Sequence, residues 1–390
     1  MSLVAPRLPP TESLSRRSPV IALLGLSWLH FLNDGAANFL PGVLPAILVA
    51  LHRGPEWASV IMATLLIGQG LQPIMGWLSD RVGGRAATLL GASGTSLGIV
   101  LVGQSDHLPT LLAALVLIGA SNAAFHPQSL ALARSLAGRG HGATMSAFLV
   151  GGELGRGLYP LIASLAVASF GTPGLWVVAL PALLTIPFIA PLLPPLAPRP
   201  AHAAPLQWRK HAGPAASLIA YVSLRSFVLY ALVTFLPILA NRSGTSLIGG
   251  ASLISVLLVV GVIGNISGGL IADRLGRPVV LVGSSLLTAL LIATYLVSRG
   301  WISWTVLGML GIALFSALPV SVLAGQDIFP ENRSLGSGIA LGLGNSLGAL
   351  LLLAFGTQTS AHGVHTALWM LPPVALACAF LATRLPRAPS

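Results

Sequence analysis

The sequence predicts an all-α membrane protein with twelve transmembrane helices in two parallel six-helix repeats. Three observations lead to this prediction. The chain is 55% hydrophobic and only 7% charged, with a mean hydropathy of +0.88, whereas soluble domains carry roughly 25% charged residues. A charged loop occurs twice, about half a chain length apart, and the basic residues fall largely on one side of the expected helices. These features exclude a soluble globular protein.

The apolar segments give the number and order of the helices. A transmembrane helix needs about 20 mainly apolar residues, and the charged, proline and glycine clusters separate twelve such segments. The expected spans are 20–50, 57–79, 86–104, 109–132, 143–168, 174–193, 214–240, 246–272, 278–298, 302–327, 334–356 and 364–384. The expected organisation is an N-terminal cytoplasmic tail (1–19), a first six-helix half (20–193), a Pro-, Ala- and Arg/Lys-containing cytoplasmic linker (194–213), a second six-helix half (214–385) and a cytoplasmic tail (386–390).

The repeated loop shows how the two halves are related. It reads Gly-Trp-Leu-Ser-Asp-Arg-Val-Gly-Gly-Arg at 76–85 and Gly-Leu-Ile-Ala-Asp-Arg-Leu-Gly-Arg at 269–277, which places the two aspartates 193 residues apart. At the same offset, Gly155 aligns with Gly348. Each copy follows one apolar segment and precedes another, so the halves run in the same sense. Parallel repeats of this kind are typical of transporters.

The basic residues indicate the orientation. With twelve spans, fifteen of the 20 arginine and lysine residues fall on the side of the N-terminus, and only Arg53, Arg242 and Arg299 fall on the other. Arg156 and Arg225 lie within expected helices. Basic residues accumulate on the cytoplasmic side of membrane proteins. We therefore expect a multi-pass protein of the cell inner (plasma) membrane, in contact with the lipid bilayer, with both termini in the cytoplasm.

Several other functional classes are excluded. The net charge of +11 lies between apolar segments rather than along one face, so we expect no nucleic-acid partner. The single cysteine, Cys378, rules out a disulfide framework. His362 and His365 have no cysteine or carboxylate beside them, so no metal site is expected. No phosphate-binding loop of the Gly-x-x-x-x-Gly-Lys-Ser/Thr type occurs. We expect neither an enzyme nor a bound cofactor, and a monomeric chain.

The charged loops resemble the hallmark of the major facilitator superfamily, a Gly-x-Leu-x-Asp-Arg-x-Gly-Arg-type loop between the second and third helices that is weakly repeated in the second half. The resemblance covers essentially the whole chain after residue 20. Three further stretches look like the fosmidomycin-resistance branch: 30–35 (His-Phe-Leu-Asn-Asp-Gly), 125–128 (Phe-His-Pro-Gln), and the glycine pair 151–152 followed by Gly155 and Pro160. The resemblance implies a transporter fold and drug/proton efflux.

The first copy of the loop is a candidate gate. Asp80 closes the second expected helix, and Arg81 and Arg85 open the turn before the third. A carboxylate at this position can accept hydrogen bonds from a helix N-terminus of the opposite half. The family arrangement implies the eleventh helix as the partner, in a contact that breaks when the cytoplasmic side opens. The alternative is that these residues only fix the topology.

The second half offers further gating candidates. Asp273 and Arg274 are the second copy of the Asp-Arg pair. Arg134 and Asp327 align with each other at the 193-residue offset, at the expected cytoplasmic ends of the fourth and tenth helices. These two residues either join the charge network of the gate or are solvated helix ends.

Asp34, within the first expected helix, is the main proton-coupling candidate, with Asn33 beside it as a substrate-binding candidate. A charge in the bilayer costs at least ~2.5–3.5 kcal/mol on insertion scales, so each intramembrane ionisable residue is a functional candidate. Burial disfavours a charged carboxylate and a nearby cation favours it, so alternation between environments can load and release a proton. His30 shares a helical face with Asp34 and is either a proton relay or a packing residue.

Glu153 and Arg156 are three residues apart on the fifth expected helix, near the middle of the membrane. They either neutralise each other or form a substrate-sensitive pair, in which Arg156 leaves Glu153 to bind an anionic group. Glu153 is then a second proton-coupling carboxylate.

Three further residues are substrate-binding candidates. Arg225, in the seventh expected helix, has no acidic residue near it in sequence, so it needs a counter-charge from the substrate or from another helix, for example Asp34. Asn122 and His126 share a face of the fourth helix, and Pro127 frees a carbonyl group next to them.

Together, the sequence predicts a secondary transporter that exports a small organic anion or drug by proton antiport and alternating access. The alternatives are proton symport for uptake of a carboxylate, phosphonate or sugar-like metabolite, and a membrane sensor that keeps the transporter fold without flux.

Overall fold

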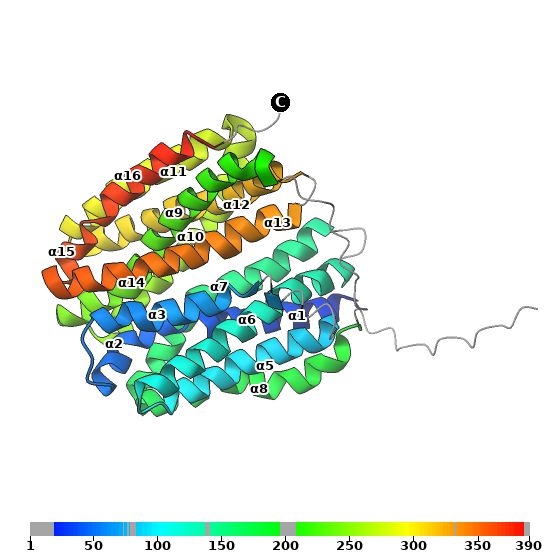
Figure 1. Cartoon of the computed structure of the whole chain (residues 1–390). Helices are drawn as coiled ribbons and strands as arrows, with labels where there is room; N and C mark the ends of the chain where they lie inside the picture. The colour runs from blue at the N-terminus through cyan, green and yellow to red at the C-terminus, as the bar shows by residue number, and fades with distance from the viewer. Residues whose placement is uncertain are drawn as a thin grey trace, which may run out of the picture.

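The computed structural model describes residues 19–72, 74–75, 78, 83–136, 141–195, 208–330 and 333–385, and every regular element in these ranges is helical (Figure 1). The first half contains α1 (Pro19–Asn38), α2 (Leu40–Ala50), α3 (Glu56–Gln69), α5 (Gly84–Gly103), α6 (Leu108–Leu136), α7 (His141–Phe170) and α8 (Trp176–Ile189), with 3-10 turns at Thr172–Leu175 and Ala190–Leu192. The second half contains α9 (Trp208–Arg242), α10 (Leu247–Leu275), α11 (Arg277–Val297), α12 (Trp301–Ile328), α13 (Arg333–Gly338), a π-helical turn (Ile339–Leu343), α14 (Gly344–His362), α15 (Val364–Leu368) and α16 (Leu371–Ala382).

Ten segments of the described chain are long and apolar enough to cross a membrane. Two other spans were expected. The span 57–79 corresponds to α3 and to residues after it that lie partly outside the described ranges. The span 143–168 corresponds to α7, which carries Glu153 and Arg156. The all-helical membrane fold is confirmed, and the number of twelve helices stays a prediction.

One expected span is interrupted, and one helix begins earlier than expected. The span 20–50 is interrupted at Phe39, between α1 and α2, with Pro41 in the first turn of α2. Proline at this position lacks an amide hydrogen that the first turn does not use. The second half was expected to begin at residue 214, whereas α9 begins at Trp208. The helix therefore extends into the predicted linker.

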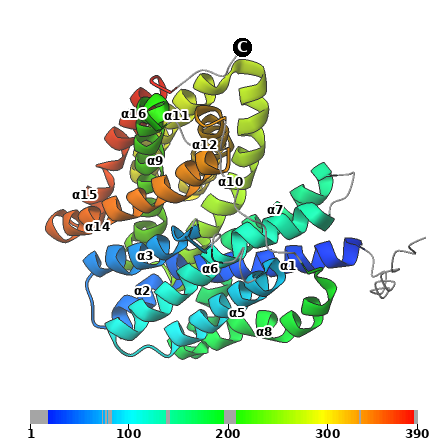
Figure 2. The same cartoon turned by 45° about the vertical axis from the view of Figure 1, so that its right-hand side comes forward.

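The same pairs of helices pack together in both halves. In the first half, α1 packs on α7, α3 on α6 and α5 on α8. In the second half the corresponding pairs are α9 with α14, α10 with α12, and α11 with α16. This correspondence agrees with the predicted repeat. The halves meet mainly through α3 with α14 and α7 with α10, which Figure 2 shows side by side.

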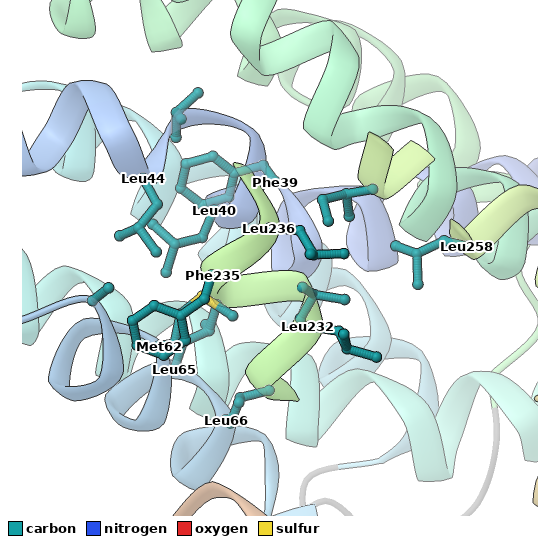
Figure 3. Packing of buried hydrophobic residues seen from close by; sticks show 14 of the residues in the cluster. Phe39, Leu40, Leu44, Met62, Leu65, Leu66, Leu232, Phe235, Leu236 and Leu258 are labelled. Carbon is teal, nitrogen blue, oxygen red and sulfur yellow. The ribbon is translucent and has the colours of Figure 1, made fainter. Parts of the chain in front are cut away.

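Among the described residues, the halves share a buried apolar core at one end of the bundle and have separate cores at the other. We call the end where α1 and α9 begin the linker end, and the opposite end the far end. At the far end one continuous core joins both halves. Figure 3 shows Phe235 and Leu236 of α9 among Leu40, Met62 and Leu65 of the first half. At the linker end each half has its own core, one around Leu26 and Leu132 and the other around Leu218 and Val320.

Close contact between α1 and α7 depends on glycine. A Cβ atom at Gly155 would lie 2.0 Å from the carbonyl oxygen of Phe31, and one at Gly151 would lie 2.5 Å from that of Ser27. Small residues at such interfaces let helix backbones approach each other within a membrane. This contact brings the residues of α7 up to those of α1.

We expect Gly155→Ala to destabilise the protein by about 1–3 kcal/mol, because the added methyl group forces the backbones of α1 and α7 apart. The measurement is the thermal unfolding midpoint of the purified protein in detergent. The matched control is Gly283→Ala on α11, where an added Cβ meets nothing within 4 Å. Equal midpoints for the two variants would contradict this account of the packing.

Candidate functional site

The candidate site is centred on Asp34, whose side chain is only 2% exposed within the first half. Its Oδ1 atom lies 3.2 Å from Nε2 of His126, and it accepts hydrogen bonds from Nδ2 of Asn33 at 3.3 Å and Nδ2 of Asn122 at 3.4 Å. The carboxylate is thus held from its own helix and from α6. Asn122 and His126 were expected to share a face of α6, and both contact Asp34.

The other carboxylate oxygen faces two basic groups. Oδ2 of Asp34 lies 3.5 Å from Nε2 of His30 and accepts a hydrogen bond from Nη2 of Arg156 at 3.3 Å. His30 comes from the same helix, and Arg156 comes from α7. Three basic side chains therefore surround one buried carboxylate, which compensates much of the cost of burying its charge.

The hydrogen bonds of His30 define what this group can do chemically. Its Nδ1 lies 2.8 Å from the carbonyl oxygen of Phe148, and a carbonyl oxygen only accepts, so Nδ1 carries a proton. Nε2 then faces Asp34 either as a second N–H group or as a lone pair opposite a protonated carboxyl. The pair His30–Asp34 can hold one exchangeable proton. Gly152 leaves room for the ring, because a Cβ there would lie 2.4 Å from Nε2.

Arg156 connects Asp34 to Glu153. Its Nη1 lies 3.4 Å from both carboxylate oxygens of Glu153, on the same helix, while Nη2 contacts Asp34. The pair expected from the i, i+3 spacing is formed, and Arg156 has a second acidic partner that the spacing did not indicate. The side chains of Glu153 and Arg156 are 21% and 28% exposed. They are more accessible than Asp34.

Two contacts were not expected from the sequence. Thr95 of α5 donates a hydrogen bond to Oδ1 of Asn33 at 3.3 Å. Tyr230 of α9 lies near Arg156 and also near Arg225. A threonine or a tyrosine in an apolar helix gives no particular signal, so only the packing of the helices reveals these neighbours.

The cluster has residue types that also bind metals. His30, Asp34 and His126 each have one atom that could bind a metal ion, and these three atoms lie within 4.8 Å of one another. The hydrogen bond from Nδ1 of His30 to a carbonyl oxygen is also common for metal-binding histidines. Against this, the guanidinium group of Arg156 contacts the same carboxylate and would repel a divalent cation. The geometry suits a proton better than a metal ion.

The expected gating residues are only partly described. Asp80 and Arg81 lie outside the described residues, and Arg85 is half-buried in the first turn of α5. Asp273 and Arg274 are exposed in the last turn of α10.

The symmetry mates Arg134 and Asp327 have different surroundings. Asp327 of α12 forms an ion pair with Arg277, the first residue of α11, while Arg134 is exposed at the end of α6. A charge network that includes Asp327 therefore runs through Arg277 within the second half.

Arg225 neighbours Tyr230, as Arg156 does, but forms no ion pair with Asp34. Asp34 was one candidate counter-charge for it, but Asp34 pairs with Arg156 instead. In the described chain, no ion pair joins Arg225 to a carboxylate. Arg225 lines a small cavity between α9, α11, α12 and α16.

The family of the chain follows from a comparison with models of known families. The sequence model of the Major Facilitator Superfamily matches residues 26–352. The chain belongs to this superfamily. Transporters of the superfamily are not enzymes, in agreement with the prediction from the sequence.

Two relatives match over nearly the whole chain. An uncharacterized transporter of the superfamily from Bacillus subtilis strain 168, YfnC, is 28% identical over 93% of this chain and 90% of its own length. The Fosmidomycin resistance protein of Escherichia coli strain K12 is 26% identical over 95% of each. These matches support the resemblance to the fosmidomycin-resistance branch.

Solved structures share the fold. The nucleoside transporter NupG superposes with a TM-score of 0.77 at 14% identity, over 94% of this chain and 98% of its own. A bacterial homologue of the human lysosomal transporter Spinster, in an inward-facing and occupied conformation, gives 0.77 at 15% identity, over 95% and 98%. At such low identity the likeness concerns the fold alone.

The geometry predicts unequal effects of removing the two members of the Glu153–Arg156 pair. Arg156→Gln leaves two neighbouring carboxylates without their shared cation, whereas Glu153→Gln leaves Arg156 with Asp34. We expect Arg156→Gln to be more destabilising by roughly 1–3 kcal/mol, measured as the thermal unfolding midpoint at neutral pH. The difference should shrink in acid, where the carboxylates are protonated. The control is Arg242→Gln, at an exposed helix end. Equal losses would mean that Asp34 does not depend on Arg156.

Proposed function

We propose that this protein is a proton-coupled exporter that exchanges protons for a small organic anion or an amphiphilic drug by alternating access. The observation that carries the proposal is Asp34, a carboxylate that is almost fully buried and is contacted by His30, His126 and Arg156. Ionisable residues inside transmembrane bundles mark proton and substrate pathways. Similarity to the Fosmidomycin resistance protein over 95% of the chain supports export of a drug-like substrate.

The orientation in the membrane follows from the distribution of basic residues, and is part of the proposal. We place the chain in the inner membrane, with the linker end and both termini in the cytoplasm. The far end, where the halves share one hydrophobic core, then faces outward. The halves have separate cores at the cytoplasmic end, as expected of a conformation that opens inward.

Exchange requires that the proton and the substrate compete for one group. We propose that this group is Asp34. A proton held by His30 and Asp34 neutralises the carboxylate of Asp34, and Arg156 then forms its ion pair with Glu153 alone. When the proton leaves, a hydrogen-bond donor of the substrate takes its place at Asp34, while an anionic group of the substrate binds Arg156. Asn33 and Asn122 fix the carboxylate, and the partly exposed His126 gives the proton a path to it.

The contact between Asp34 and Arg156 is also compatible with the alternative mechanism, uptake by proton symport. Protonation of Asp34 weakens its hold on Arg156, which is then available to an anion. A carboxylate or phosphonate without a donor group would therefore bind together with the proton rather than in its place. The charge and donor groups of the substrate thus decide the direction of coupling.

Asp34→Asn should reduce proton-coupled transport to background, because an amide side chain does not bind and release a proton near neutral pH. The test uses purified protein in liposomes with a pH-sensitive dye inside and an imposed proton gradient. Asp106→Asn, in an exposed loop, is the matched control and should behave as the wild type. Unchanged pH-dependent flux in Asp34→Asn would remove Asp34 as the proton carrier.

The direction of proton flow separates the transport alternatives. In the same liposomes we would add organic anions, phosphonates and cationic drugs in turn. Proton movement opposite to the substrate is expected for molecules that carry both a donor and an anionic group, and means antiport. Movement in the same direction means symport. Silence across the panel from folded protein would favour the sensor with a transporter fold.

A further inference from the structure

The second half contains a small cavity that the transport mechanism does not use. It is lined from α9, α11, α12 and α16 of this half, and the lining residues with polar side chains are Arg225, Tyr221, Ser284, Ser285, Thr288 and Cys378. The space open to the centre of a water-sized sphere is about 10 Å³, which holds roughly one water molecule or one ion of similar size.

Arg225 contributes an uncompensated positive charge to this cavity. Its side chain is 7% exposed, and its Nε atom has no hydrogen-bond partner. Its hydrogen bond from Nη2 to the hydroxyl of Ser226, at 3.4 Å, is long. Arg225 lies near the middle of α9. An arginine side chain stays protonated in proteins, so the charge cannot be removed by losing a proton.

The described carboxylates are engaged elsewhere or lie outside the bundle interior. Asp34 and Glu153 contact Arg156, and Asp327 pairs with Arg277. Asp273 is exposed at the end of α10. A buried charge is strongly unfavourable without a counter-charge. Among the described residues of the second half, no carboxylate therefore balances the charge of Arg225.

We propose that the cavity binds a small inorganic anion, chloride, as the counter-ion of Arg225. The guanidinium group supplies the charge and an unused N–H donor, and the polar lining consists of hydroxyl groups that can donate hydrogen bonds. Thr288 is buried there, while Ser285 donates at 2.7 Å to the carbonyl oxygen of Leu281 in its own helix. Such a hydroxyl turns toward an anion by rotation about one bond. Of the remaining lining residues, Tyr221 carries a hydroxyl group and Cys378 a thiol, and the others are apolar. In the described chain no carboxylate lines the cavity.

The bound anion would stabilise the second half and leave the proton site untouched. Because chloride binds only the folded protein, the unfolding midpoint rises with its concentration and then saturates. The proposal does not rest on the proposed transport activity, since its readout is stability.

The test compares thermal unfolding of the purified chain in sodium chloride and in sodium gluconate at equal ionic strength. We expect chloride to raise the midpoint of the wild type by several degrees over gluconate. Arg225→Gln should lose this difference, and Arg242→Gln should keep it. If Arg225→Gln does not fold, Thr288→Val decides, because it keeps the charge and removes one donor. It should need several-fold more chloride for the same rise.

Two results would overturn the proposal. One is an unfolding midpoint that depends on ionic strength alone, whatever the anion. The other is a chloride effect that survives in Arg225→Gln or is unchanged in Thr288→Val. Crystals grown with bromide give a second check, because the anomalous signal of bromide should appear beside Arg225. A water molecule at that position, with no bromide signal, would also count against an anion site.

Discussion

The buried negative charge of Asp34 is the constraint around which the first half is organised. It lies on α1, and its partners come from α1, α6 and α7. Each partner depends on local packing: the glycines of α7 let Arg156 approach α1, and Gly152 makes room for His30. Loss of the charge on protonation changes the balance among three helices at once. This coupling is what a proton-driven conformational change requires.

Much of this arrangement could be predicted from the sequence, and the rest could not for identifiable reasons. Hydropathy and the repeated loop predicted the helical membrane fold, and helical spacing placed His30 with Asp34, Asn122 with His126, and Glu153 with Arg156. These are contacts within one helix or one helical face. The contacts of Asp34 with His126 and Arg156 join different helices, whose relative rotation no periodicity specifies. Arg225 was expected to need a counter-charge from the substrate or from another helix. In the described chain no ion pair joins it to a carboxylate, and it lines a cavity of its own half.

The two halves treat buried charge differently despite their related architecture. In the first half, Arg156 bridges two carboxylates, and histidines complete the set. In the second half, the position that aligns with Asp34 at the repeat offset is Phe227, and the neighbouring Arg225 has no acidic partner in the described chain. Ser226, which aligns with Asn33, donates instead to Asn345 at 2.6 Å. The first half therefore contains an acid–base cluster, and the second half contains a cation with neutral polar neighbours.

The shared core at the far end has a thermodynamic consequence. It consists of aliphatic and aromatic side chains from both halves (Figure 3), so separation of the halves at this end exposes apolar surface to water. Hydration of apolar surface has a large positive heat capacity, and the attraction between such surfaces weakens on cooling. The free-energy difference between the two orientations of the halves should therefore be a curved function of temperature. Cold would favour the conformation in which the far end is open.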